Sequence, residues 1–236
     1  MAQSYAAQPQ YSLKGITIFA HLPCDALERI QRCCFWRNYE QGESIIQYLD
    51  GSDDVFFITA GQARVTIYSS AGKAVSIGEL GAGDVFGEYA AIDHRPRSAS
   101  VEARTNCVVA SMHAADFLEL LQDQPTVTLG LLMQLVRKTR AVTRRVYEFS
   151  TLHVNNRIQA EVLRLANLAP REGKRARIAP APTHFEIASR VNTHREAVTR
   201  ELNRLSRLGI IERRGGTLLV RDIDCLTQMV HDVIDE

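Results

Sequence analysis

Long apolar runs and the common catalytic motifs are both missing from this sequence. No stretch approaches the roughly 18 apolar residues of a membrane span, and the opening MAQSYAAQPQ has no basic n-region or apolar h-region of a secretory signal. The seven histidines are scattered, with no H-E-x-x-H, G-x-S-x-G or Gly-Lys-Ser/Thr phosphate loop. We therefore expect a cytoplasmic protein that is not an enzyme and holds no metal.

Cysteine is scarce and irregularly spaced. The chain has five cysteines, an odd number without a C-x2-C pattern, which is typical of a reduced compartment. The 236 residues are 45% hydrophobic and 23% charged, so they can form two modest domains with real cores.

Charge is unevenly distributed, although the net charge is only +1. Residues 1–151 carry 14 basic and 16 acidic side chains, a net of −2, whereas residues 152–221 carry 14 basic and 6 acidic ones, a net of +8. The basic part is the candidate for binding a polyanion, with nucleic acid the first choice.

The first half of the chain has the pattern of a small antiparallel β-structure. Short β-rich segments alternate with turn sequences rich in Gly and Asp. The segments are ESIIQYL, VFFITA, ARVTIY, AVSIGEL and CVVASM, and the turns are DGSDD, AGQ, SSAGK and GAGD. This alternation predicts a sandwich or jelly roll.

Residues 85–101, VFGEYAAIDHRPRSASV, lie between two of these strands and combine a glycine, an acid and an arginine. Gly87 lets the backbone approach a ligand closely. Glu88 can accept hydrogen bonds from a sugar hydroxyl, and Arg97 offers donors shaped for a phosphate oxygen. One arginine without a lysine cluster indicates a nucleotide with a single phosphate charge. The alternative is a surface ion pair beside a turn.

GAGDVFGE followed by PRSASV resembles the phosphate-binding cassette of cyclic-nucleotide-binding domains. From about residue 16 to 225 the chain is similar to the Crp–Fnr family of transcription regulators, and most to its cyclic-AMP-responsive branch. The resemblance implies that Glu88 binds the ribose 2′-hydroxyl and Arg97 the cyclic phosphate. The implied pocket is completed by Gly87, Tyr89 (through its backbone) and Ser98.

A long helix is predicted after Gln124-Pro125. Apolar residues recur there at heptad spacing, which indicates a parallel two-fold dimer; the alternative is a helix packed on its own domain. The heptad seam consists of Leu132, Leu135, Thr139, Val142, Val146 and Phe149. In the family, two adjacent hydroxyl residues of this helix touch adenine, and the matching residues are Val142 and Thr143. Thr143 fits and Val142 does not, so cyclic AMP is the favoured ligand and cyclic GMP the second.

The basic part has the pattern of a helix-turn-helix followed by a wing. Thr183 to Glu186 and Thr193 to Glu196 have the spacing of capping boxes, each opening a short helix. Asn192 lies in the turn, where a residue that tolerates the left-handed conformation is needed. Residues 209–222 form a predicted hairpin that turns at two glycines.

The second of these helices holds the candidate base-reading residues Arg195, Glu196 and Arg200. Arginine binds guanine with two hydrogen bonds, and glutamate accepts one from cytosine. The sequence REAVTR resembles the family's recognition helix, which implies a palindromic TGTGA-like site in double-stranded DNA. Alternatively, Glu196 only caps its helix and pairs with Arg200. Arg213 and Arg214 of the wing are expected to contact phosphates.

The predicted fold class is α+β, in three parts. These are a cyclic-nucleotide-binding β-roll (1–125), a dimerisation helix (126–152) and a winged helix-turn-helix domain (153–236). The resemblance also implies RNA polymerase as a partner. Two alternatives stay open. One is a redox or iron–sulfur sensor on the same scaffold, although Cys24, Cys33, Cys34 and Cys107 lack suitable spacing. The other is an enzyme acting on cyclic nucleotides.

Overall fold

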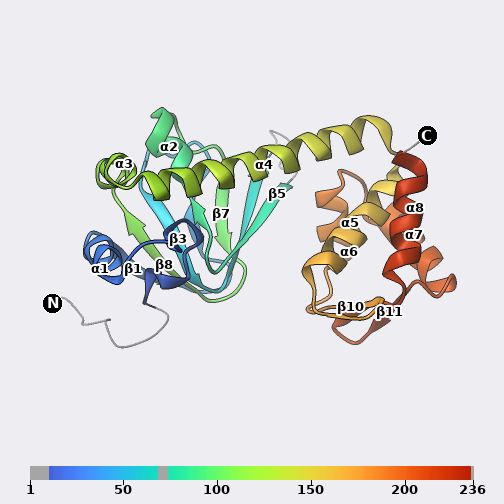
Figure 1. The fold of residues 1–236 in the computed structure, drawn as a ribbon. Coiled ribbons are helices and arrows are strands. Elements are labelled where there is room, and N and C mark those ends of the chain that lie inside the picture. Colours follow the sequence, from blue (N-terminus) through green and yellow to red (C-terminus); the bar gives the residue numbers. More distant parts are fainter. Residues whose placement is uncertain (1–10, 69–73, 235–236) are drawn as a thin grey trace. The chain divides into compact units, whose positions relative to one another are not determined.

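Two separate units make up the chain, which a computed structural model describes over residues 11–68 and 74–234 (Figure 1). The first unit is Met1–Lys138 and the second is Thr139–Glu236. The predicted turn SSAGK, residues 69–73, lies outside the described residues. The predicted α+β class is confirmed, because each unit combines helices with antiparallel sheet. The three-part division with borders at 125 and 152 stays a prediction.

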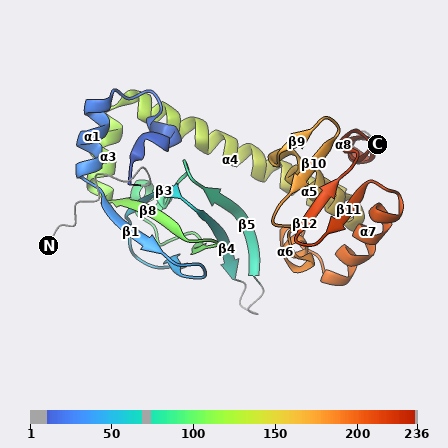
Figure 2. The ribbon, with the colours of Figure 1, turned by 90° about the horizontal axis from the view of Figure 1, so that it is seen from below.

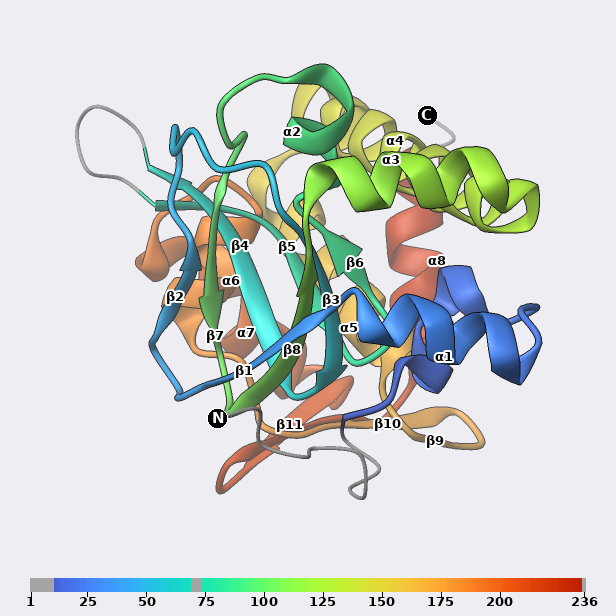
Figure 3. The same cartoon turned by 90° about the vertical axis from the view of Figure 1, so that its left-hand side faces the viewer.

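The first unit contains two four-stranded antiparallel sheets. One has the order β1-β8-β3-β6, and Figure 3 shows β1, β8 and β3 running side by side. The other has the order β2-β7-β4-β5. The strands of the first sheet are β1 (Phe35–Tyr39), β3 (Val55–Ala60), β6 (Val85–Phe86) and β8 (Cys107–Met112). Those of the second are β2 (Ser44–Ile46), β4 (Gln62–Tyr68), β5 (Ala74–Gly81) and β7 (Ser100–Ala103).

The segment 85–101, which the sequence places between two strands, has regular secondary structure of its own. It contains β6, then the short helix α2 (Glu88–Asp93), and it ends in β7. The helix begins directly after Gly87, whose φ of 83° provides the sharp turn out of the strand. The ligand-binding candidates therefore stand at a strand-to-helix junction and on the return to the second sheet.

Helices cover the first sheet of the first unit. They are η1 (Leu13–Gly15), η2 (Thr17–Phe19), α1 (Cys24–Arg32), α3 (Ala114–Asp123) and the first part of α4 (Pro125–Thr151). Phe57 of β3, Phe117 of α3 and Val127 of α4 are fully buried in one apolar cluster. Gly130 lets α4 approach the η2 backbone closely, because a Cβ there would lie 3.3 Å from the Ile18 Cα.

The second unit contains the predicted winged helix-turn-helix, with one additional helix before it in the chain and one after it. Its elements are α5 (Val154–Leu168), β9 (Arg171–Glu172), β10 (Arg175–Ile178), α6 (His184–Arg190), α7 (Arg195–Arg207), β11 (Ile211–Arg214), β12 (Thr217–Val220) and α8 (Ile223–Ile234). Figure 2 shows β12 between β11 and β10, and the sheet order is β11-β12-β10-β9. Ile187, Val198 and Leu205 join α6 and α7 in one apolar core, as their helical spacing predicts.

Candidate nucleotide and DNA sites

Gly87 occupies a position that no larger residue can fill without displacement. Its φ is 83°, in the left-handed region, and a Cβ there would lie 2.9 Å from both the Arg97 Nη1 atom and the Asp54 carbonyl oxygen. The missing side chain brings the start of α2 against the Arg97 guanidinium. This is the close backbone approach that the sequence predicts at this glycine.

Arg97 is a buried cation whose hydrogen-bond partners are all neutral. It is only 2% exposed. Its Nη1 donates to the Gly87 carbonyl at 2.9 Å, its Nη2 to the Asp54 carbonyl at 2.8 Å and its Nε to the Ser52 hydroxyl at 3.1 Å. Among the described residues no carboxylate lies within salt-bridge distance of this guanidinium. A buried charge is costly without an opposite charge, so the arrangement favours an incoming anion.

The electrostatics of Arg97 fit this interpretation. Burial lowers the pKa of Arg97 below its ordinary value, and the nearby carboxylates, that of Asp54 foremost, oppose the shift. A guanidinium carries more N–H donors than the three that are used here. The remaining donors are available to phosphate oxygens without breaking the bonds that hold the side chain.

The turn that precedes β3 holds Arg97 from the other side. The Arg97 N–H donates to the Asp50 carbonyl at 2.9 Å, and the Leu49 N–H donates to the Arg97 carbonyl at 3.0 Å. With Ser52 and Asp54, this turn contacts both the backbone and the side chain of Arg97. From the sequence, DGSDD is recognisable only as a turn, because nothing local connects it with a residue more than forty positions away.

Glu88 already has a cationic partner. Glu88 is 2% exposed, and its carboxylate accepts a hydrogen bond from the Lys138 Nζ atom at 2.8 Å. The same ammonium lies 5.8 Å from the centre of the exposed Tyr89 ring. Sequence reasoning missed Lys138, which is one of several basic residues in RKTR on α4. It could be identified only from the tertiary structure, in which α4 contacts β6 through a hydrogen bond from Gln134 to the Val85 carbonyl.

The two remaining nucleotide candidates are placed differently. Ser98 is exposed and directly follows Arg97. Thr143 is an exposed residue of the second unit, and its hydroxyl donates to the Thr139 carbonyl at 3.0 Å within α4. Within the first unit the structure brings Gly87, Glu88 and Arg97 together with Lys138.

The predicted entry to the helix-turn-helix is confirmed at its first capping box. The Thr183 hydroxyl accepts from the Glu186 N–H at 3.1 Å, and the Glu186 carboxylate accepts from the Thr183 N–H at 2.7 Å. Asn192 in the turn has a φ of 51°, the left-handed conformation predicted for it.

The predicted second capping box is wrong. Helix α7 begins one residue later than expected, with His194 as its N-cap and no side-chain cap bond. The Thr193 N–H instead donates to the Ala188 carbonyl at 3.0 Å, which closes the end of α6. A capping box would need the Thr193 N–H as the donor to Glu196, and this N–H is already bonded to Ala188.

Arg195, Glu196 and Arg200 are all exposed on α7. The structure records no ion pair between Glu196 and Arg200 among the residues that it describes. The alternative role of Glu196 as a capping residue is also removed, because Thr193 is not the cap. The three side chains are therefore accessible to a partner.

The wing is a short hairpin that turns at Gly215-Gly216, and both predicted phosphate-contacting arginines are exposed on it. Arg214 is paired with Glu212 at 2.6 Å, and Glu212 also contacts Arg221. Hydrogen bonds from Arg214 and then Arg221 lower the pKa of Glu212. Arg213 lies next to this group and has no ion pair among the described residues.

No group of His, Cys, Asp and Glu suited to hold a metal occurs among the described residues. Within the same residues, no helix is both long and apolar enough to cross a membrane.

Two family models match the chain, one on each half. The cyclic nucleotide-binding domain matches residues 36–124, and the Crp-like helix-turn-helix domain matches residues 157–229. The matched regions contain the Arg97 site and the helix-turn-helix with its wing.

Relatives match over most of their length. The chain is 30% identical over 202 residues to the cAMP-activated global transcriptional regulator Vfr of Pseudomonas aeruginosa, which covers 82% of this chain and 92% of Vfr. It is 28% identical over 223 residues to the cyclic AMP receptor protein of Thermus thermophilus, covering 92% and 98% of the two chains. The name of the Pseudomonas aeruginosa relative describes a transcriptional regulator.

The fold is also shared with solved structures. The c-di-GMP responsive global regulator CLP of Xanthomonas campestris superposes with a TM-score of 0.74 at 21% identity, covering 84% of this chain and 99% of that one.

Proposed function

This chain belongs to the Crp–Fnr family of DNA-binding transcription regulators, and from that membership we propose that a cyclic nucleotide switches its binding to a palindromic TGTGA-like site. Cyclic AMP is the favoured ligand and cyclic GMP the second. The proposed protein acts in the cytoplasm as a homodimer and has RNA polymerase as a partner. The observation that carries the proposal is the buried Arg97, which has only neutral partners.

In the proposed complex each site residue has one task. The Arg97 guanidinium binds the cyclic phosphate with its unused N–H donors. Glu88 accepts from the ribose 2′-hydroxyl, and Lys138 stays close enough to balance the carboxylate charge. Gly87, Tyr89 (through its backbone) and Ser98 line the pocket, and Thr143 contacts the base, as the family resemblance implies.

Dimerisation through α4 is supported by its apolar residues. Apart from Leu135, which packs partly against the core of the first unit, the apolar members of the predicted seam are exposed. A single chain leaves these side chains in water, and such a stripe is typical of an interface. The exposed members are Leu132, Val142, Val146 and Phe149.

On the DNA side, Arg195, Glu196 and Arg200 read base edges, and Arg213 and Arg214 contact phosphates. This assignment is supported by their exposure and by the net charge of +8 in residues 152–221.

Isothermal titration calorimetry tests the proposal. We expect saturable binding of cyclic AMP and, more weakly, of cyclic GMP. Cyclic di-GMP is the third titrant, because a structure of the same fold is named as responsive to it. Binding of cyclic di-GMP alone would replace the proposed ligand class, and binding of none of the three would overturn the proposal of a nucleotide switch.

A further inference from the structure

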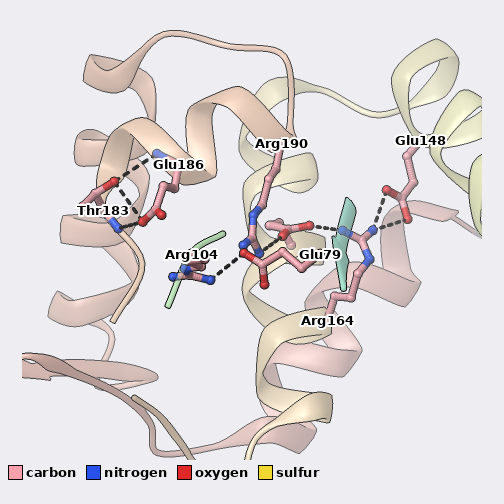
Figure 4. A network of polar contacts seen from close by, with 8 residues as sticks. Glu79, Arg104, Glu148, Arg164, Thr183, Glu186 and Arg190 are labelled. Carbon is pink, nitrogen blue, oxygen red and sulfur yellow. Dashed lines mark hydrogen bonds and ion pairs between the residues drawn. The ribbon is translucent and has the colours of Figure 1, made fainter. Parts of the chain in front are cut away.

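Four charged side chains join three helices of the second unit, and we call them the interhelical network: Glu148 of α4, Glu161 and Arg164 of α5, and Arg190 of α6. The Arg190 Nη1 atom lies 3.0 Å from a Glu161 carboxylate oxygen. Arg164 contacts the other Glu161 oxygen. Figure 4 shows Arg164 with dashed lines to both carboxylate oxygens of Glu148, at 3.2 and 3.0 Å.

Three members of the network, Glu148, Glu161 and Arg190, are buried, and Arg164 is partly exposed. Glu161 is 1% exposed and Arg190 is 9% exposed. A buried charge that loses its partner is costly, so these bonds favour one arrangement of the helices that carry them. Each carboxylate of the network is bonded to at least one guanidinium, and Glu161 is bonded to two. The network therefore fixes the relative position of α4, α5 and α6 within the second unit.

A separate buried bond connects α5 with the DNA-reading helix. The Gln159 Nε2 atom donates to a Glu201 carboxylate oxygen of α7 at 2.7 Å, and both residues are buried. Arg204 of the same helix contacts that carboxylate at 2.8 Å. Through residues 159 to 164, α5 has polar bonds to α4 and to both helices of the helix-turn-helix.

We propose that Glu148, Arg164, Glu161 and Arg190 are positioning residues that transmit the state of α4 to the helix-turn-helix. Helix α4 is continuous over Pro125–Thr151, so it begins in the nucleotide-binding unit and ends at this network. A shift of its last turns moves Glu148, and the chain of charged bonds carries that shift to α6. This inference rests on the proposed nucleotide switch.

The substitution Arg190→Met tests the inference. It removes the bond to α6, while Glu161 keeps Arg164 as a partner and the long apolar side chain fills the space. The measured quantity is the ratio of DNA affinities with and without cyclic AMP, which is typically about 5- to 150-fold in coupled systems. We expect this ratio to fall to less than about twofold while calorimetric cyclic-AMP affinity without DNA stays within about twofold of the wild type.

Reciprocity gives a second readout that a purely structural role would not change. The effect of DNA on cyclic-AMP affinity must fall by the same factor as the effect of cyclic AMP on DNA affinity. A variant that is merely destabilised would bind DNA more weakly in both states and keep the ratio. Arg164→Met removes the bond to Glu148 of α4 and the bond to Glu161 within α5, and it is expected to give the same loss.

Lys174→Met is the matched control. It removes a cation of the same unit from an exposed pair with Asp224 at 2.9 Å, and it should leave the ratio unchanged. If Arg190→Met does not fold, Arg190→Lys, which keeps the charge but loses the planar fork, is measured against the same criterion. A wild-type ratio in the Arg190 and Arg164 variants overturns the inference. If cyclic AMP, cyclic GMP and cyclic di-GMP all leave the DNA affinity of the wild-type protein unchanged, the proposed function is overturned instead.

Discussion

At the scale of the residue, the main feature of the nucleotide site is a charge that the protein buries without neutralising it. Arg97 is held by two carbonyls and a hydroxyl, so its position is fixed before any ligand arrives. A preorganised donor of this kind adds little ordering cost when it binds a phosphate. The residue type and spacing were predictable from the sequence, but the turn that holds Arg97 was not.

Arg97→Leu should nearly abolish cyclic-nucleotide binding, because the phosphate loses a buried charged partner. The expected loss is about 2–5 kcal/mol, which is at least roughly 30-fold in affinity. Calorimetry measures it. Arg95→Leu, which removes an exposed cation two positions away, is the control and should bind normally. Normal affinity in Arg97→Leu would show that the phosphate binds elsewhere.

His113 provides a pH-dependent probe next to the same turn. Its Nδ1 atom lies 2.8 Å from an Asp54 carboxylate oxygen, and this hydrogen bond raises the pKa of His113 above its ordinary value. Because the folded-state pKa is the higher one, the stabilisation is complete below the unfolded pKa and is lost as pH rises through the folded pKa. NMR titration should show the pKa of His113 falling in Asp54→Asn. Asp53→Asn should lower it much less, and equal effects would contradict this pairing.

At the scale of the element, the pattern within a segment predicted its secondary structure, whereas the contacts between segments could not be predicted. VFFITA and CVVASM match β3 and β8 in full, because β-branched and aromatic runs between turn residues specify strands locally. The strand β1 was missed, because FWRNY carries two polar residues and most of it is exposed. Lys138, Glu161 and Arg190 could not be identified as site residues, since their partners come from other elements.

Helix α4 leads to a prediction about assembly. Val146 is 58% exposed in the single chain, and Val146→Asp should weaken the dimer by placing a carboxylate in its apolar interface. Sedimentation velocity should show a larger monomer fraction at equal concentration. Arg144→Asp adds the same carboxylate two positions earlier, about 200° around the helix, and should remain dimeric. If both variants stay dimeric, α4 is not the interface.

At the scale of the whole molecule, base reading and phosphate binding are expected to separate. Arg200→Ala should weaken binding to the TGTGA-type palindrome by about 1–3 kcal/mol and affect random DNA far less. Arg213→Ala should weaken both about equally and reduce the salt dependence by roughly one contact. Arg213 is a better choice than Arg214 for this test, because Arg214 forms an ion pair with Glu212 whose loss would complicate the result. Equal losses on both DNAs for Arg200→Ala would remove it from the base-reading set.

The central claim is that nucleotide binding in one unit controls DNA binding by the other. Fluorescence anisotropy on the palindromic and random DNAs, with and without cyclic AMP, tests it most directly in the wild type and in Glu88→Ala. We predict that cyclic AMP raises wild-type affinity for the palindrome alone, and that Glu88→Ala needs far more nucleotide for the same effect. Equal affinity with and without cyclic AMP and cyclic GMP in the wild type would contradict the claim.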